Sequence, residues 1–144
     1  MKEIETVSES ENCIIHFRFA TTGSIKPANA HPFRCKDVYF AHNGVLRIET
    51  QNDKTDSETF FEQTLYPAID RYGIASKEVS AIMKPVSLYS RFALMQGETL
   101  KTFGGFTKYE GCYYSNLRFI DYLIYQSCEQ ENFYPTYSNL PGSL

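Results

Sequence analysis

His16-Phe-Arg-Phe-Ala-Thr-Thr-Gly23 is the stretch around which the rest of the sequence is best interpreted. It begins in a strand-like run, Cys13–Phe19, and breaks into a loop of small residues that Pro27 keeps from becoming helical. Residues 16 and 18 are two apart, so on a strand their side chains leave the same face. A guanidinium there suits bidentate capture of a carboxylate. An edge-strand arginine that pairs with solvent or a surface acid is an equally good interpretation of this stretch alone.

The composition excludes several classes of protein. The chain has 144 residues, which fits one domain, and 42% of them are hydrophobic. Its net charge is −3, so no general basic field would attract nucleic acid. No apolar run approaches the roughly 18 residues of a membrane span, and the polar, acidic N-terminus is unlike a signal peptide. We therefore expect a cytoplasmic protein that binds neither nucleic acid nor membrane, with its four cysteines as free thiols.

The apolar pattern after the first loop predicts two strands, residues 38–41 and 45–49, on either side of Asn43-Gly44. Asn-Gly between apolar runs is a strong hairpin signal, because both residues tolerate positive φ. A tight turn with no further role is the simpler interpretation of this pair.

Two helices should follow. The first begins near Ser57, capped by Asp56 or by Ser57 itself, and Gly73 should end it. Its apolar residues recur at helical spacing, and Pro67 predicts a kink or a break: Phe61, Leu65, Ala68, Ile69 and Tyr72. The second helix is expected over residues 76–83, with Pro85 ending it.

The last part of the chain returns to strands. Residues 86–95 and 99–109 read as a hairpin, with Gly104-Gly105 suggesting a bulge, and residues 113–126 fit either a strand or a short helix. The order of strands, helices and strands predicts an α+β domain with antiparallel sheets.

Three short motifs follow one another within the first 60 residues. The first is His16–Gly23 with Asn29-Ala-His-Pro32 close behind, the second is His42-Asn-Gly-Val45, and the third is Thr55-Asp-Ser-Glu58. Their order and spacing resemble the glutaminase domain of class II glutamine amidotransferases, which are N-terminal-nucleophile hydrolases. The three together are fairly specific, although none of them would be so alone.

The resemblance implies a role for each matching residue. Arg18 would bind the α-carboxylate of glutamine and Asp56 its α-amino group, which orients the amino acid. The side-chain amide of Asn43 and the backbone N–H of Gly44 would form the oxyanion hole of a tetrahedral intermediate. The substrate pocket would be shaped by three further residues, of which the second departs from the histidine common in the family: Thr21, Thr22 and His31.

The nucleophile implied by the resemblance is not found. In the family it is a cysteine at the mature N-terminus, whose own α-amino group acts as the base. Here the chain reaches His16 soon after Met1, and Cys13 lies on the same predicted strand as Arg18. A degenerate gene, a start internal to a longer frame and a separate chain that supplies the missing strand all fit this observation.

From the resemblance we expect the αββα layers of N-terminal-nucleophile hydrolases, with antiparallel sheets and one or more N-terminal strands missing. The incomplete domain would span residues 13–126, after a polar lead-in at 1–12 and before a loosely ordered tail at 127–144. A missing strand exposes a sheet edge, so we expect a homo-oligomer or a partner chain that completes the sheet.

The expected function is the binding of glutamine, related to hydrolysis of its side-chain amide to glutamate and ammonia, without metal or cofactor. One alternative is a catalytically inactive glutamine-binding or partner protein that keeps Arg18 and Asp56. Another is a small zinc module, since Cys13-x-x-His16 and His31-x-x-x-Cys35 have ligand-like spacing. Zinc is less favoured, because residues 13 and 16 point to opposite faces of a strand.

Overall fold

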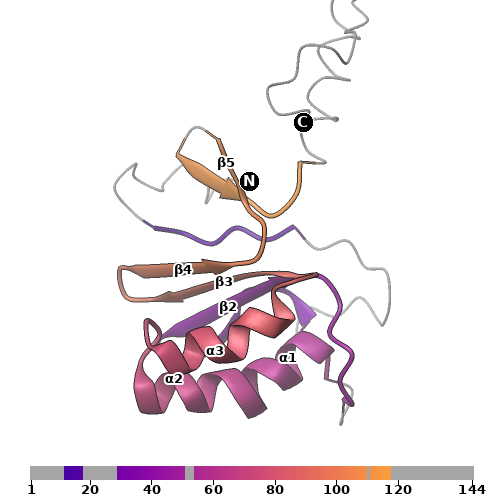
Figure 1. Cartoon of the computed structure of the whole chain (residues 1–144), viewed down its shortest axis with the longest axis vertical. Helices are drawn as coiled ribbons and strands as arrows, with labels where there is room; N and C mark the ends of the chain where they lie inside the picture. Colours follow the sequence, from indigo (N-terminus) through magenta and orange to yellow (C-terminus); the bar gives the residue numbers. More distant parts are fainter. Residues whose placement is uncertain (1–11, 18–28, 51–53, 110, 118–144) are drawn as a thin grey trace, which may run out of the picture. The chain divides into compact units, whose positions relative to one another are not determined.

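A four-stranded antiparallel sheet forms the centre of the first part of the chain (Figure 1). The structure is a computed structural model, and it describes residues 12–17, 29–50, 54–109 and 111–117. The chain divides into two compact units, residues 1–106 and 107–144. The strands of the sheet lie in the order in which they occur: β1 (Phe33–Cys35), β2 (Val38–Asn43), β3 (Arg91–Gln96) and β4 (Thr99–Phe103).

The register of the sheet separates its two faces. Phe40 lies opposite Phe33 on one side and opposite Leu94 on the other. Directly opposed residues project to the same face, so these side chains share one side of the sheet. Ala41 and Ala93 are opposed in the same way on the other side. The alternation along β2 therefore places His42 on the face of Phe40 and Asn43 on the face of Ala41.

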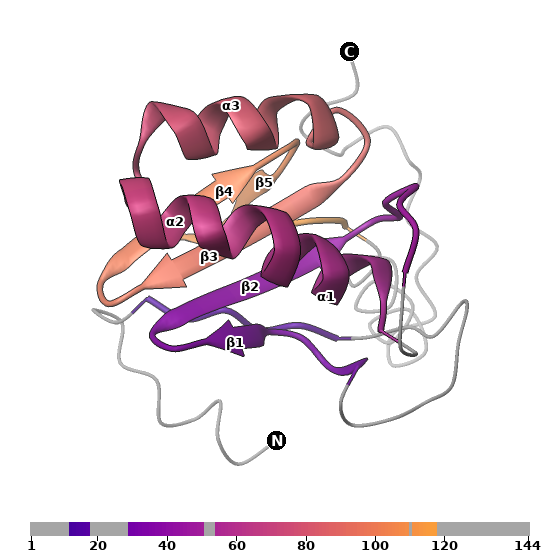
Figure 2. The same cartoon turned by 90° about the horizontal axis from the view of Figure 1, so that it is seen from below.

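Helices cover the face of Phe40 (Figure 2). The first helical segment is continuous from residue 56 to residue 72 and comprises α1 (Asp56–Phe60), η3 (Phe61–Leu65) and α2 (Tyr66–Tyr72). η3 is a turn of π-helix, whose hydrogen bonds span one residue more than those of an α-helix. Pro67 lies inside this continuous segment, directly after η3, so the helix does not break there, and Gly73 ends the segment with φ +86°. α3 (Lys77–Val86) follows after a short turn.

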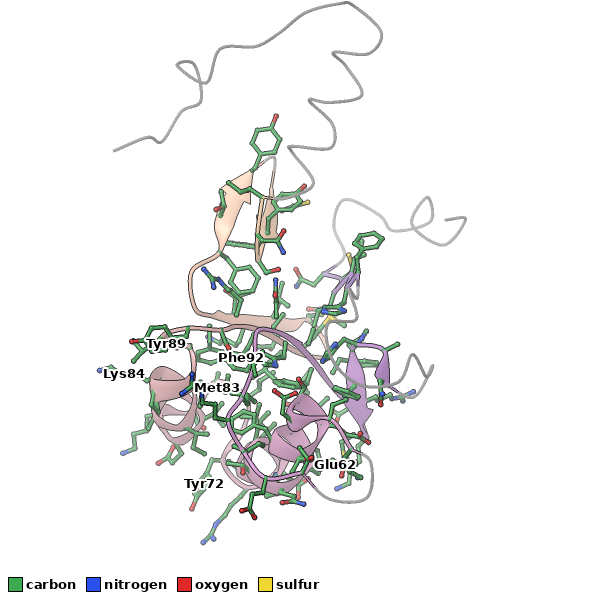
Figure 3. The ribbon with its side chains drawn as sticks, turned by 90° about the vertical axis from the view of Figure 1, so that its right-hand side faces the viewer. Glu62, Tyr72, Met83, Lys84, Tyr89 and Phe92 are labelled. Carbon is green, nitrogen blue, oxygen red and sulfur yellow. The ribbon has the colours of Figure 1, made fainter. Side chains whose placement is uncertain are left out.

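Stacked aromatic rings fill the space between the helices and the sheet. The ring of Phe40 stacks on that of Phe61 with centroids 5.0 Å apart, and on that of Phe92 at 6.0 Å. Phe92 in turn stacks on the imidazole of His42 at 4.5 Å with an interplanar angle of 9°. Met83 and Phe92 point into this layer, whereas Glu62, Tyr72 and Lys84 lie at its outside (Figure 3). The core therefore extends along β2 as far as the second motif.

The opposite face of the sheet is crossed by residues 12–17 (Figures 1 and 2). At one end the side-chain amide of Asn12 donates to the carbonyl of Glu98, at 2.8 Å, in the turn between β3 and β4. At the other end the ring of His16 lies 4.3 Å from that of His31, before β1. Phe17 ends the described part of this segment with 85% of its surface exposed.

The second unit contains a separate two-stranded antiparallel sheet within its described residues. β5 (Thr107–Tyr109) pairs with β6 (Cys112–Tyr114), and Thr107 lies opposite Tyr114. Residues 118–144 lie outside the described part of the chain, and with them most of the segment 113–126 and the predicted tail.

Two predicted strands are wrong. The described part of the predicted strand Cys13–Phe19, residues 13–17, is not a strand, because it crosses a face of the sheet and does not join its ladder; Arg18 and Phe19 lie outside the described residues. Residues 45–49 are not a strand either, and Asn43-Gly44 does not join a hairpin. β2 pairs with β1 on one side and β3 on the other, which leaves no edge for a strand that follows Gly44 directly.

The helix boundaries also differ from the prediction in detail. Thr55 caps the first helix, since its hydroxyl accepts from the amide of Glu58 at 3.1 Å, so neither Asp56 nor Ser57 is the cap. Pro85 lies inside α3, which continues to Val86. The predicted apolar stripe is correct except at its end, because Tyr72 is 48% exposed.

The mixture of helices and antiparallel sheet confirms the predicted α+β class. Among the described residues, no helix combines the length and the apolar character that crossing a membrane requires.

Candidate functional site

The second motif lies where β2 ends. Asn43 is the last residue of the strand, half-buried and opposite Arg91 on β3. Its side chain projects to the face that residues 12–17 cross, because it alternates with His42. The guanidinium Nε of Arg91 donates to the carbonyl of Gly105 at 3.2 Å. An amide and a cation thus share this end of the sheet.

Gly44 occupies a position that admits no side chain. Its φ is +151°, and a Cβ built on it would lie 2.1 Å from the Ser90 hydroxyl oxygen and 3.0 Å from His42 Nε2. Only glycine adopts this backbone without strain and without collision. Gly44 itself is exposed to solvent. It therefore packs against Ser90 and His42 on its buried side and is accessible on the other.

Asp56, from the third motif, holds the start of α1 against the chain that leaves β2. Its Oδ2 accepts from the amide of Leu46 at 2.6 Å. Its Oδ1 accepts from the amide of Ser57 at 2.7 Å and from the Ser57 hydroxyl at 3.2 Å. A carboxylate has about four acceptor positions, so the half-buried Asp56 keeps capacity for one further donor.

Ser57 links the two motifs directly. Its hydroxyl oxygen lies 2.7 Å from Nδ1 of His42, and both side chains are buried. A hydrogen-bonded chain therefore runs from Asp56 through Ser57 to His42, the residue before Asn43 and Gly44. This chain of hydrogen bonds joins Asp56, the expected ligand of the α-amino group, to the residue before the expected oxyanion hole.

The imidazole of His42 is kept neutral by its surroundings. Burial lowers its pKa from 6.5 to about 4, because the charged form loses its hydration. The carboxylate of Asp56 opposes this and raises the pKa, whereas His16 lowers it further. At neutral pH the side chain is an uncharged part of the core, and only 3% of its surface is exposed.

His31 lies beside the first segment. Its ring packs edge-on against that of His16 at 4.3 Å and against that of Phe33 at 4.6 Å. His16 is also near enough to act on the pKa of His42. The three histidines of the chain therefore gather at one end of β1 and β2, within the part of the chain that the structure describes.

Three predicted site residues, Arg18, Thr21 and Thr22, lie outside the described residues. Among the described residues, the structure joins Asp56, through Ser57, to His42, which precedes Asn43 and Gly44. No group of three or more metal-ligating side chains occurs among residues 12–17, 29–50, 54–109 and 111–117.

A family profile described as class II glutamine amidotransferases matches residues 2–93 of the chain. The chain belongs to this family. The match spans the three motifs, α1 to α3 and the first residues of β3, which confirms the resemblance inferred from those motifs. Searches among curated proteins and among solved structures gave no significant match.

Sequence reasoning missed three residues that contact the predicted site residues Gly44 and Asp56 or lie next to Asn43. Ser57 lies inside the third motif, where the sequence indicates only a possible helix cap. His42 lies inside the second motif, where the resemblance implies roles only for Asn43 and Gly44. Their contact depends on bringing residues 15 positions apart together. Ser90 packs under Gly44 from a loop 46 residues further along, and no local pattern in the sequence indicates it.

Proposed function

We propose that this class II glutamine amidotransferase domain binds L-glutamine at the end of β2 and is built for hydrolysis of its side-chain amide. The observation that carries the proposal is the hydrogen-bonded connection from Asp56 through Ser57 to His42, the residue that precedes Asn43-Gly44. An amino-acid site needs one group for the α-ammonium and another for the reacting amide. In support of such a site, Asp56 and His42, which directly precedes Asn43, belong to one hydrogen-bonded framework.

Asp56 is the proposed ligand of the α-ammonium group. Three of its acceptor positions are filled by the amide of Leu46 and by the amide and hydroxyl of Ser57. These donors fix the carboxylate in orientation and leave one acceptor position for a cation. Arg18 is the proposed partner of the α-carboxylate, as the resemblance implies.

Asn43 and Gly44 are the proposed oxyanion hole. Gly44 is exposed, which leaves room for the amide carbon of a substrate to approach its backbone N–H. The side-chain amide of Asn43 supplies a second donor, and donors placed in advance stabilise charge that develops in the transition state. Loss of one such donor typically costs roughly 10²–10³ in rate.

The chemistry requires a nucleophile that attacks the amide carbon and releases ammonia. In the family this is a terminal cysteine, and we assign that role to no residue described here. A glutamine-binding protein without hydrolysis is therefore the second candidate, and it needs only Asp56 and Arg18.

Calorimetric titration of the chain with L-glutamine tests the proposal. We expect binding to the wild-type chain, with L-glutamate as the comparison ligand, and a loss of at least tenfold in affinity in Asp56→Asn, because the neutral amide does not compensate the ammonium charge. Asp70→Asn on the exposed side of α2 is the matched control and should bind as the wild type does.

Release of ammonia during the same titration separates the two candidates. Glutamate and ammonia produced in equal amounts would support hydrolysis, whereas binding without product would support the glutamine-binding protein. A folded chain that binds no glutamine would refute both.

A further inference from the structure

The hydrogen-bonded chain from Asp56 to His42 has a direction that the geometry decides. An ionised carboxylate only accepts hydrogen bonds, so the contact of 3.2 Å between Asp56 Oδ1 and the Ser57 hydroxyl requires the hydroxyl to donate. The same hydroxyl oxygen then accepts from Nδ1 of His42, at 2.7 Å. His42 therefore carries its proton on Nδ1, and its Nε2 bears a lone pair.

The surroundings of Nε2 support this tautomer. Nε2 is buried and has no hydrogen-bond partner among the described residues. It faces the position where a Cβ of Gly44 would stand, at 3.0 Å, a space that the side chain of Ser90 also borders. The opposite tautomer would place an N–H there with no acceptor in hydrogen-bonding geometry among the described residues, and a buried donor without an acceptor is unfavourable.

We propose that Ser57 is a positioning residue of the glutamine site. Its hydroxyl holds the carboxylate of Asp56 on one side and sets the tautomer and orientation of His42 on the other. The ammonium-binding group and the strand end that carries Asn43 and Gly44 are thereby placed relative to each other. The effect on glutamine binding rests on the proposed function, whereas the tautomer of His42 does not.

Nitrogen-15 NMR of the histidine side chains tests the tautomer in the ligand-free chain at pH 7. In the wild type we expect a protonated Nδ1 and a lone-pair Nε2 for His42, assigned by the loss of its signals in His42→Gln. In Ser57→Ala the Nδ1–H preference should disappear, and Ser57→Thr should restore it, because threonine keeps the hydroxyl. An Nε2–H tautomer in the wild type, or an unchanged tautomer in Ser57→Ala, would overturn the proposal.

The same variants, titrated with L-glutamine, test the positioning role. We expect affinity to fall about tenfold in Ser57→Ala and to return to within about twofold in Ser57→Thr, since a hydrogen bond to a charged group is lost and then regained. Ser80→Ala, which removes an exposed hydroxyl that donates to the Ser76 carbonyl, is the control and should bind as the wild type does. Wild-type affinity in Ser57→Ala would overturn the positioning role.

The NMR measurement and the L-glutamine titration test separate parts of the proposal. A wild type that binds no glutamine refutes the proposed function, and the NMR result still decides whether Ser57 sets the tautomer of His42. Should Ser57→Ala not fold, the wild-type tautomer and the behaviour of Ser57→Thr decide the same question.

Discussion

At the scale of single residues, Gly44 occupies a position that has no room for a side chain. Two independent obstacles oppose a side chain there: the backbone φ of +151°, and the hydroxyl of Ser90 at 2.1 Å from an ideal Cβ. Gly44→Ala should therefore lower the free energy of unfolding by about 3 kcal/mol, through backbone strain and overpacking together. Chemical denaturation of purified wild type and variant measures this.

Gly97 provides the matched control for that measurement. It also has a positive φ, +55°, but nothing lies within 4 Å of its Cβ position. Gly97→Ala should cost only about 1 kcal/mol, since the backbone conformation is its sole obstacle. Removing the colliding side chain in Gly44→Ala/Ser90→Gly should recover part of the loss, and equal costs at positions 44 and 97 would contradict the packing argument.

His42 makes the stability of the fold depend on pH. Its pKa is lowered to about 4 in the folded chain, against 6.5 in an unfolded one, mainly by burial. Between these values the unfolded state binds more protons, so stability falls as the pH falls from 6.5 toward 4. The loss from this one group is about 3 kcal/mol at 1.36 kcal/mol per pH unit.

Urea denaturation at several pH values between 7 and 4 checks this contribution, with His42→Gln as the reference. Carboxyl groups titrate in the same range in both proteins, so the difference between the two curves isolates His42. Asp56 and His16 act on the same imidazole with opposite signs and modify the slope without reversing it. The same dependence of the unfolding free energy on pH in the wild type and in His42→Gln would show that folding does not lower the pKa of His42.

At this scale the sequence predicts the candidate site from three motifs. The resemblance assigns roles to Asn43, Gly44 and Asp56, and in the structure a hydrogen-bonded chain joins Asp56 to His42, the residue before Asn43. The contacts that support them were not predictable, because Ser57 meets His42, and Ser90 meets Gly44, only after the helices and β3 have packed on β2. Local patterns do not encode which distant residue fills such a space.

At the scale of elements, the position of Asp56 depends on where α1 begins, because Asp56 is the first residue of that helix. The hydroxyl of Thr55 satisfies the amide of Glu58 and so fixes the first turn of the helix. Thr55→Ala should reduce the free energy of unfolding by about 1 kcal/mol, the usual cost of losing a capping side chain. Thr55→Ser keeps the hydroxyl and should retain most of the stability in the same thermal or urea denaturation. Equal losses in both variants would show that the methyl group matters and the cap does not.

The predictions are correct for the helix, where the spacing of apolar residues indicates which side chains are buried. They are wrong for the strand after Gly44, because strand pairing depends on the topology of the whole sheet. Phe61, Leu65 and Ile69 recur at helical spacing and are buried. Asn43-Gly44 has every local sign of a hairpin, yet β2 pairs with β3, whose first residue is 48 positions after Asn43. Val45 is 74% exposed as a result. An Asn-Gly pair shows that the backbone can turn at that position. It does not determine which strand pairs with β2, because that depends on how the core packs.

At the scale of the whole molecule, the faces of the sheet in the first unit are unequally covered. Helices bury one face, whereas in the described part of the chain residues 12–17 cross the other, where Tyr39, Met95 and Leu100 are only half-buried. The association with a second copy or a partner chain that we expected from the sequence stays a prediction. Light scattering on the purified chain should show a species larger than a monomer, because partly exposed apolar faces favour association.

Met95→Lys tests whether that face takes part in the association. A charge placed there should shift the light-scattering mass toward the monomer, whereas Ser80→Ala on the exposed side of α3 should leave it unchanged. A monodisperse monomer in the wild type would contradict the prediction of self-association.

The π-helical turn η3 has a consequence for changes in chain length. A π turn is an α-helix that has absorbed one additional residue, so the helix on either side keeps its phase. Loss of one exposed residue such as Gln63 would convert η3 into ordinary α-helix, with Asp56 still facing β2 and Ile69 still in the core. The same deletion at Ser80 in α3, which has no such turn, would rotate Met83 by about 100° away from its packing. We expect a chain shortened by one codon to fold in the first case and to be strongly destabilised in the second, as thermal denaturation of the two deletion variants would show.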